Sequence, residues 1–257
     1  MNFWNLLVLD PMINLLLWIY NLLGSFGVSI VLFTILVRML TYPLTIQQMK
    51  GTQVMQDLQK SKEWQDLQKK HKGDKQKLQQ EQAKFMQEKG VSPFGSCLPT
   101  LIQFPIIIGL YQAIIRALAS TPLQMVDFSR HIYPFINAAS FLPIQNQFLW
   151  MDLSQPERLY VFGIGIPVLA ILVVITTFMQ SRLMTPPSQP GEQSAQMAQS
   201  MNTIMPLMMG WLALTFASGL SVYFVASNLV SIGQYAAMGK LDWRNLIPTK
   251  KPAQVNK

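Results

Sequence analysis

A single arginine lies within a long apolar stretch, and this combination constrains the fold more than any other feature of the chain. The stretch, residues 26–44, can cross a bilayer, because a spanning helix needs about 20 residues. A charge at that depth costs about 2.5–3.5 kcal/mol on insertion scales, so intramembrane charges usually meet a bundle interior or a water-filled cavity. Two interpretations stay open for Arg38. It is a structural residue that snorkels to the interface, or a functional one that meets water, a protein partner or an anion.

The composition is that of a membrane protein without metal or redox chemistry. Half of the 257 residues are hydrophobic and 12% are charged, whereas about 25% of residues are charged in a soluble domain. Cys97 is the single cysteine, which excludes an intramolecular disulfide, and His71 and His131 lie in unrelated segments. We therefore expect no metal and no cofactor. Both histidines fall outside the apolar segments, so we also expect no intramembrane protease and no other enzyme.

Five segments satisfy the length and hydropathy required of membrane spans. They are approximately residues 26–46, 97–118, 160–181, 201–216 and 219–238. These segments predict an all-α membrane protein with a five-span core over residues 26–240.

Residues 1–25 are predicted to form an interfacial helix that leads into the first span. Trp4, Trp18 and Tyr20 suit the headgroup level of a bilayer. A sixth span is the weaker alternative, because polar residues and a proline interrupt the apolar run. These interruptions are Asn5, Asp10, Pro11 and Asn14.

The polar region between the first two spans, residues 47–90, contains ten lysines and six acidic residues. A turn at Lys72-Gly73-Asp74 predicts a helical hairpin of about residues 48–70 and 75–89. Its apolar positions form only a thin stripe, so it should pack weakly and move easily. The hairpin is either a mobile capture arm or a solvated element that serves only solubility. The lysines expected to act in capture are Lys60, Lys62, Lys69 and Lys70.

The distribution of basic residues predicts the topology. Both the hairpin and the tail, residues 241–257, are rich in lysine, whereas the 119–158 loop is nearly balanced in charge. The positive-inside rule places the hairpin and the tail in the cytoplasm. An odd number of spans then places the N-terminus outside a plasma or inner membrane. The short basic tail fits ribosome binding and attraction to the membrane surface equally well.

Polar side chains of the predicted spans gather toward the cytoplasmic halves of their helices. Thr34 precedes Arg38 by one helical turn, so both lie on one face. Further polar residues of the spans are Gln103, Gln112, Thr176, Thr177, Gln180, Asn202, Thr203, Ser227, Asn228 and Gln234. No acidic residue lies in any predicted span, although a channel needs a continuous polar path and a coupled transporter usually needs acidic relays. A cationic cavity open to one side instead suits a polar, often acidic, stretch of polypeptide.

Four motifs in combination resemble those of one known family. The first span carries Thr34-Ile-Leu-Val-Arg38 and then Tyr42-Pro43-Leu44-Thr45. Residues 92–105 read SPFGSCLPTLIQFP, residues 148–153 read FLWMDL, and residues 218–224 read SGLSVYF with Asn228 following. Over about residues 24–240, these segments are similar to the motifs of the YidC-type membrane protein insertases of bacteria, mitochondria and thylakoids. Ser92 and Phe224 depart from the residues usual in that family, asparagine and tyrosine or tryptophan.

The resemblance implies a five-helix bundle with a hydrophilic groove that opens to the cytoplasm and the lipid. The family inserts and folds nascent membrane proteins, alone or with the Sec translocon and without ATP, so no small-molecule substrate is expected. Arg38 would attract the acidic or polar tail of a client. The other residues expected to line the groove are Thr34, Gln103, Gln180, Phe224 and Asn228. A small transporter or channel subunit is the main alternative, followed by a purely structural assembly subunit.

Overall fold

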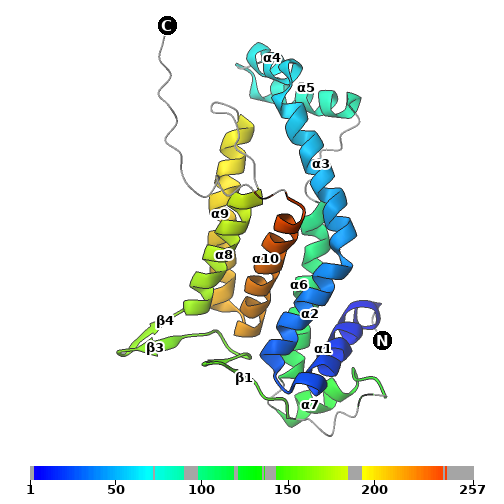
Figure 1. Ribbon diagram of the computed structural model, residues 1–257, viewed down its shortest axis with the longest axis vertical. Coiled ribbons are helices and arrows are strands. Elements are labelled where there is room, and N and C mark those ends of the chain that lie inside the picture. The colour runs from blue at the N-terminus through cyan, green and yellow to red at the C-terminus, as the bar shows by residue number, and fades with distance from the viewer. Residues whose placement is uncertain are drawn as a thin grey trace. The chain divides into compact units, whose positions relative to one another are not determined.

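The computed structural model in Figure 1 describes residues 3–71, 73–89, 98–118, 121–134, 136, 143–184, 193–239 and 241. Within these residues the chain is mostly helical and includes two short β-hairpins. It forms two compact units, one of residues 1–38 and 108–257 and one of residues 39–107. The motif over residues 92–97 and the predicted tail after residue 241 lie outside the described residues.

The larger unit holds most of the helices. Its elements are η1 (Asn5–Leu9, a π-helix), α1 (Asp10–Leu23), α2 (Phe26–Leu40), the second half of α6 (Leu98–Ala117), α7 (Pro122–Ser129), β1 (Gln147–Phe148), β2 (Met151–Asp152), β3 (Leu159–Val161), β4 (Ile164–Ile166), α8 (Val168–Met184), α9 (Gln193–Thr215) and α10 (Ser218–Ala237). Helices α8, α9 and α10 lie side by side (Figure 1). Strands β1 and β2 form one antiparallel hairpin, and β3 and β4 form the other.

The N-terminal helix is continuous from Asn5 to Leu23. Two of the polar residues expected to interrupt it, Asp10 and Asn14, are instead buried and hydrogen-bonded. The Nδ2 group of Asn14 donates to the His131 carbonyl at 2.8 Å, and its Oδ1 atom accepts from the Tyr133 backbone N–H at 2.7 Å. The Asp10 carboxylate contacts the His131 ring at 2.6 Å. These long-range partners satisfy the polar groups of Asp10 and Asn14. The two residues therefore do not argue against a longer apolar helix.

Among the described helices, Asn5–Leu23 is the one that is long and apolar enough to cross a membrane by itself. Phe26–Leu40 and Tyr42–Gly51 would qualify together as an interrupted pair, and Val168–Met184 and Thr203–Thr215 are shorter apolar helices. The five-span count and the interfacial role of residues 1–25 therefore stay predictions.

The predicted span 160–181 was wrong at its start. Residues 159–166 form the β3–β4 hairpin, whose two-residue turn places Phe162 and Gly163 at positive φ of 52° and 82°. Turns of this kind match the twist of antiparallel strands, so the segment folds back instead of entering a helix. Helix α8 begins after Pro167, and the buried Glu157 carboxylate accepts a 2.9 Å hydrogen bond from the Leu169 backbone N–H. This contact satisfies one of the free N–H groups of the first turn.

Two other predicted boundaries also differ. The first span was expected to continue to residue 46, but α2 ends at Leu40 and α3 (Tyr42–Lys60) begins after a break at Thr41, with Pro43 in its first turn. Proline is well tolerated at the start of a helix but not in its interior. The fourth span was expected to begin at about residue 201, but α9 begins at Gln193.

The smaller unit contains α3, α4 (Lys62–Lys70), α5 (Lys75–Glu88) and the first half of α6. The predicted turn lies between α4 and α5, where the Asp74 side chain caps α5 by accepting from two backbone N–H groups. Trp64 is buried between these helices, with its ring 6.0 Å from that of Phe85. Lys89 joins the contact through a 2.8 Å ion pair with Glu63. The apolar contact between the helices is thus centred on Trp64.

Residues 146–155 connect the helices of the larger unit. The backbone N–H of Gly219 donates to the Leu153 carbonyl at 3.1 Å, and the Ser218 hydroxyl donates to the Asp152 carbonyl at 2.7 Å. These bonds satisfy groups at the N-terminus of α10. On α2, a Cβ atom at Gly27 would lie 2.1 Å from Cγ of Phe148, so the aromatic ring lies directly against the glycine backbone.

This close approach predicts that Gly27→Ala destabilises the protein. The added methyl group would displace the Phe148 ring, and overpacking of this kind typically costs about 1–3 kcal/mol. Gly233→Ala is the matched control, because a Cβ atom there would have no heavy atom within 4 Å. Denaturant unfolding of the detergent-solubilised protein, followed by tryptophan fluorescence, should show a lower midpoint for Gly27→Ala only. Equal midpoints for the two variants would contradict the packing argument.

Candidate functional site

Arg38 is held between α2 and α10. The Ser227 hydroxyl accepts hydrogen bonds from Nε, at 3.0 Å, and from Nη2 of the guanidinium. One turn further along α10, the Ser231 hydroxyl donates to the Ser227 carbonyl of the same helix. Two turns along, the Gln234 amide donates to the Arg38 carbonyl at 2.9 Å. The Ser227 hydroxyl is neutral, so it orients the guanidinium without cancelling its charge.

A second set of polar contacts joins α10 to α8. The Nδ2 group of Asn228 donates to the Thr176 hydroxyl at 3.0 Å and to the Thr177 hydroxyl at 2.9 Å. All three residues are buried. Because Asn228 follows Ser227 directly, the two sets are continuous along α10. We call this group the polar cluster; its members are Arg38, Thr176, Thr177, Ser227, Asn228 and Gln234.

Three further predicted groove residues lie on the same helices as this cluster. Thr34 is fully buried, and its hydroxyl donates to the Ile30 carbonyl at 2.6 Å, so it is satisfied within its own helix. Phe224 is also buried, one turn before Asn228 on α10, and its ring lies 5.7 Å from that of Tyr223. Gln180 lies one turn after Thr176 on α8 and is partly exposed. Direct client contact by these residues stays a prediction.

Gln103 belongs to the first half of α6, in the smaller unit, and is partly exposed. The capture lysines lie in the same unit. Lys62, Lys69 and Lys70 are exposed at the two ends of α4, and Lys60 ends α3. On α5, a hydrogen bond from Lys84 holds the pKa of the exposed Glu81 carboxyl below its usual value, so charges of both signs persist on this surface.

Sequence reasoning selected Arg38 and Asn228 but passed over Ser227 and Gln234 as site residues. Their spacing carried a signal, since Ser227, Ser231 and Gln234 recur at i, i+4 and i+7 and so lie on one side of a helix. Such a polar stripe on an apolar helix indicates a neighbour that needs hydrogen-bond partners. Arg38 is that neighbour.

The chemistry available at the polar cluster is electrostatic. Within the described residues, no group of three or more histidine, cysteine or acidic side chains could hold a metal ion. The cluster offers an oriented cation among hydroxyl and amide groups in an apolar bundle. An acidic or polar peptide segment is a suitable ligand, because charge-assisted hydrogen bonds to carboxylates strengthen in a low-dielectric setting.

Comparison with known proteins gives a consistent result. The profile of the family described as "60Kd inner membrane protein" matches residues 18–243. The membrane protein insertase MisCA of Bacillus subtilis (strain 168) is 35% identical over 91% of this chain and 78% of its own length. Membrane protein insertase YidC 2 of Bacillus anthracis is 34% identical over 90% of this chain and 79% of its own length.

The fold agrees with a solved structure of the same class. An active YidC insertase, crystallised with its first transmembrane domain resolved, superposes with a TM-score of 0.59 at 23% sequence identity, over 92% of this chain and 47% of that one. This likeness concerns the fold. The match of the family profile to most of the chain, together with the identity to the Bacillus proteins over most of their length, shows that the chain belongs to the YidC-type membrane protein insertase family.

Proposed function

We propose that this protein inserts nascent membrane proteins into the bilayer by receiving their polar tails at the polar cluster. The observation that carries the proposal is the setting of Arg38. Its guanidinium lies within an apolar bundle and is oriented by the neutral Ser227 hydroxyl, while Gln234 binds its carbonyl. A cation in this setting favours the arrival of an acidic group far more than an exposed cation would.

The energetics of insertion require no fuel under this proposal. Burial of apolar surface contributes about 25 cal/mol per Å², so transfer of a whole client span into lipid is strongly favourable. The barrier is the polar tail, which has no hydrogen-bond partners in hydrocarbon. A hydrated polar site part-way across the membrane shortens the dry path. The membrane potential adds about 2.3 kcal/mol per charge per 100 mV for acidic groups that move outward.

The wider arrangement is part of the proposal. Five spans would form a groove that opens to the cytoplasm and to lipid, with the N-terminus outside and the tail inside. The lysine-rich hairpin would meet the client first, because its charge attracts acidic segments or ribosomal RNA over about a Debye length, roughly 8 Å at physiological salt. The Sec translocon and the ribosome are the partners expected on this basis.

Arg38→Ala should strongly slow the insertion of single-span clients with acidic tails, because the attracting charge is lost. Arg38→Lys should retain partial activity, since a point charge supplies attraction without the bidentate geometry of arginine. The assay is insertion into vesicles that contain only this protein, at matched protein levels. Arg182→Ala is the control, because Arg182 lies at the end of α8, where it stacks on Phe178 outside the polar cluster. Equal insertion by wild type and Arg38→Ala would refute the electrostatic role.

Deletion of residues 48–89 should slow or abolish insertion while the helices of the larger unit stay folded in the membrane. Circular dichroism and membrane extraction check the folding of the remainder. Hydrogen exchange in the intact protein should be faster over α4 and α5 than over α8 and α10, because Trp64 and Leu78 are the buried apolar side chains among the described residues of α4 and α5. Normal insertion by the deletion variant would leave the hairpin with a solubility role alone.

A further inference from the structure

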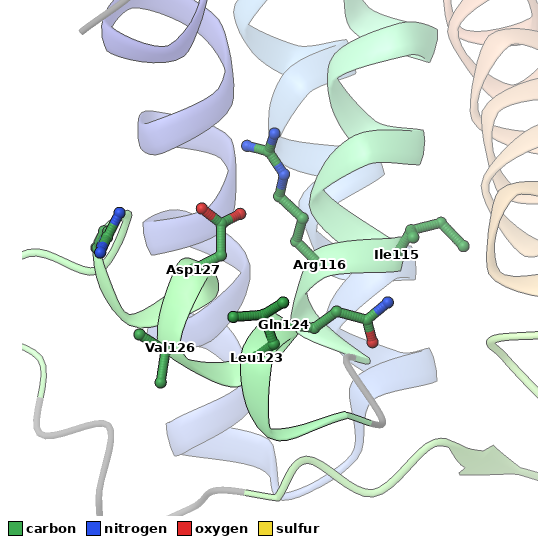
Figure 2. A pocket seen from close by; sticks show the side chains of 7 residues that line it. Ile115, Arg116, Leu123, Gln124, Val126 and Asp127 are labelled. Carbon is green, nitrogen blue, oxygen red and sulfur yellow. The ribbon is translucent and has the colours of Figure 1, made fainter.

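A pocket of about 390 Å³ lies apart from the polar cluster, between the last turns of α6 and helix α7. Arg116 lines it from α6, and Asp127 and Arg130 line it from α7 and its C-terminal end. Figure 2 shows the Arg116 and Asp127 side chains extending in the same direction from these two neighbouring helices. The pocket therefore combines two cations with one anion.

A partly buried chain of hydrogen bonds sets the position of Arg116. The His131 Nδ1 atom lies 2.6 Å from the Asp10 carboxylate, so Nδ1 carries the proton that this bond requires. The opposite ring nitrogen, Nε2, lies 3.0 Å from Nη1 of Arg116. Arginine can only donate, so Nε2 must accept, and the ring is neutral. The imidazole thus holds Arg116 in place without adding positive charge, and it separates the Asp10 carboxylate from the guanidinium.

The pocket carries an unbalanced positive charge. Among the described residues, neither Arg116 nor Arg130 has a carboxylate oxygen within 4.0 Å. Asp127 and Arg130 are both exposed. Among the residues that line the pocket, two guanidinium groups and one carboxylate leave a net charge of +1, which matches one phosphodiester group; the Asp10 carboxylate lies outside the lining, behind the His131 ring. Guanidinium groups bind phosphate oxygens well, because their N–H donors match the oxygen geometry.

Besides Gln124, the remaining walls of the pocket are three apolar side chains, all of them uncovered. Leu123 is 81% exposed, Val126 is 55% exposed and Ile115 is 37% exposed. A water-soluble anion would make no favourable contact with such exposed apolar side chains, whereas a lipid has a charged headgroup and apolar chains together. The chain belongs to a family of membrane proteins, so lipid is available at this surface.

We propose that this pocket binds the headgroup phosphate of an anionic phospholipid, with Arg116 and Arg130 on the phosphate and Leu123, Val126 and Ile115 against the glycerol and acyl chains. Under the topology predicted above, the end of α6 places the lipid in the outer leaflet. The bound lipid would anchor α7 at the membrane surface, on the opposite side of the bilayer from the proposed entry of clients.

Native mass spectrometry of the full-length protein in detergent tests the proposal, with phosphatidylglycerol and phosphatidylcholine of equal chain length as ligands. Wild type should retain phosphatidylglycerol in preference to phosphatidylcholine. Arg130→Gln should weaken phosphatidylglycerol binding about tenfold, as expected for the loss of a charge-assisted hydrogen bond. Asp127→Asn should strengthen binding, because it removes the one negative group. Arg182→Gln, at the end of α8, is the control and should bind as wild type does.

Both Arg130 and Asp127 are exposed, so these variants keep the Asp10–His131–Arg116 chain intact and test the site without unfolding it. Unchanged phosphatidylglycerol affinity in both variants would overturn the proposal, as would equal retention of the two lipids. Displacement of the lipid by glycerol phosphate at similar concentration would indicate a soluble anion as the ligand. Displacement by an acidic peptide at similar concentration would indicate a polypeptide site. Either result would overturn the assignment to lipid.

Discussion

The hydrogen bonds between the Arg38 guanidinium and the Ser227 hydroxyl are the interaction on which the rest of the site depends. They bring a cation of α2 against α10, a helix whose next polar residue, Asn228, binds two threonines of α8. Three helices are thus joined by polar contacts in an otherwise apolar bundle. Intramembrane polar groups are expensive unless satisfied, so these contacts restrict how the helices can pack. Under the proposed function, the same contacts orient the arginine for an incoming acid.

The N-terminal end of α10 is held by a different set of contacts. Backbone groups of Ser218 and Gly219 bond to residues 153–155, and Phe148 of the same segment lies against Gly27 on α2. Helices α2 and α10 are therefore joined at both ends, by backbone contacts at one and by the arginine at the other. A bundle tied in this way can hold its polar cluster in position while a client passes. The partly buried Asp10–His131–Arg116 chain attaches the N-terminal helix to α6 and to the end of α7.

Hydropathy predicted the helices at 97–118 and 219–238 to within a few residues, because long apolar runs have few alternatives. It failed at residues 159–166, where an apolar run forms strands. The signals there were Gly163, which allows a positive φ, and Pro167, which marks a helix start. The charge within an apolar run selected Arg38, and motif resemblance added Asn228. The contacts of Asp10, Asn14 and Trp64 join residues distant in sequence or on separate helices, and no local pattern contains that information.

The family assignment explains the apolar composition and the arginine together, since an insertase must meet both lipid and polar peptide. The lysine-rich hairpin fits the same task as a separate unit with a small apolar centre around Trp64. What distinguishes this account from a transporter or channel is a polar site that opens to one side only.

Cysteine accessibility measures that property directly. Ser227→Cys and Gln180→Cys, each in a Cys97→Ser background, would place thiols beside Arg38 and one turn beyond the threonines of α8. A charged, membrane-impermeant thiol reagent should label both from the cytoplasmic side and neither from the outside. Leu214→Cys, on an exposed apolar position of α9, should stay unlabelled from both sides as the lipid-facing control. If Ser227→Cys and Gln180→Cys are labelled from the outside, or are not labelled from either side, the result would contradict a hydrated site that opens to the cytoplasm.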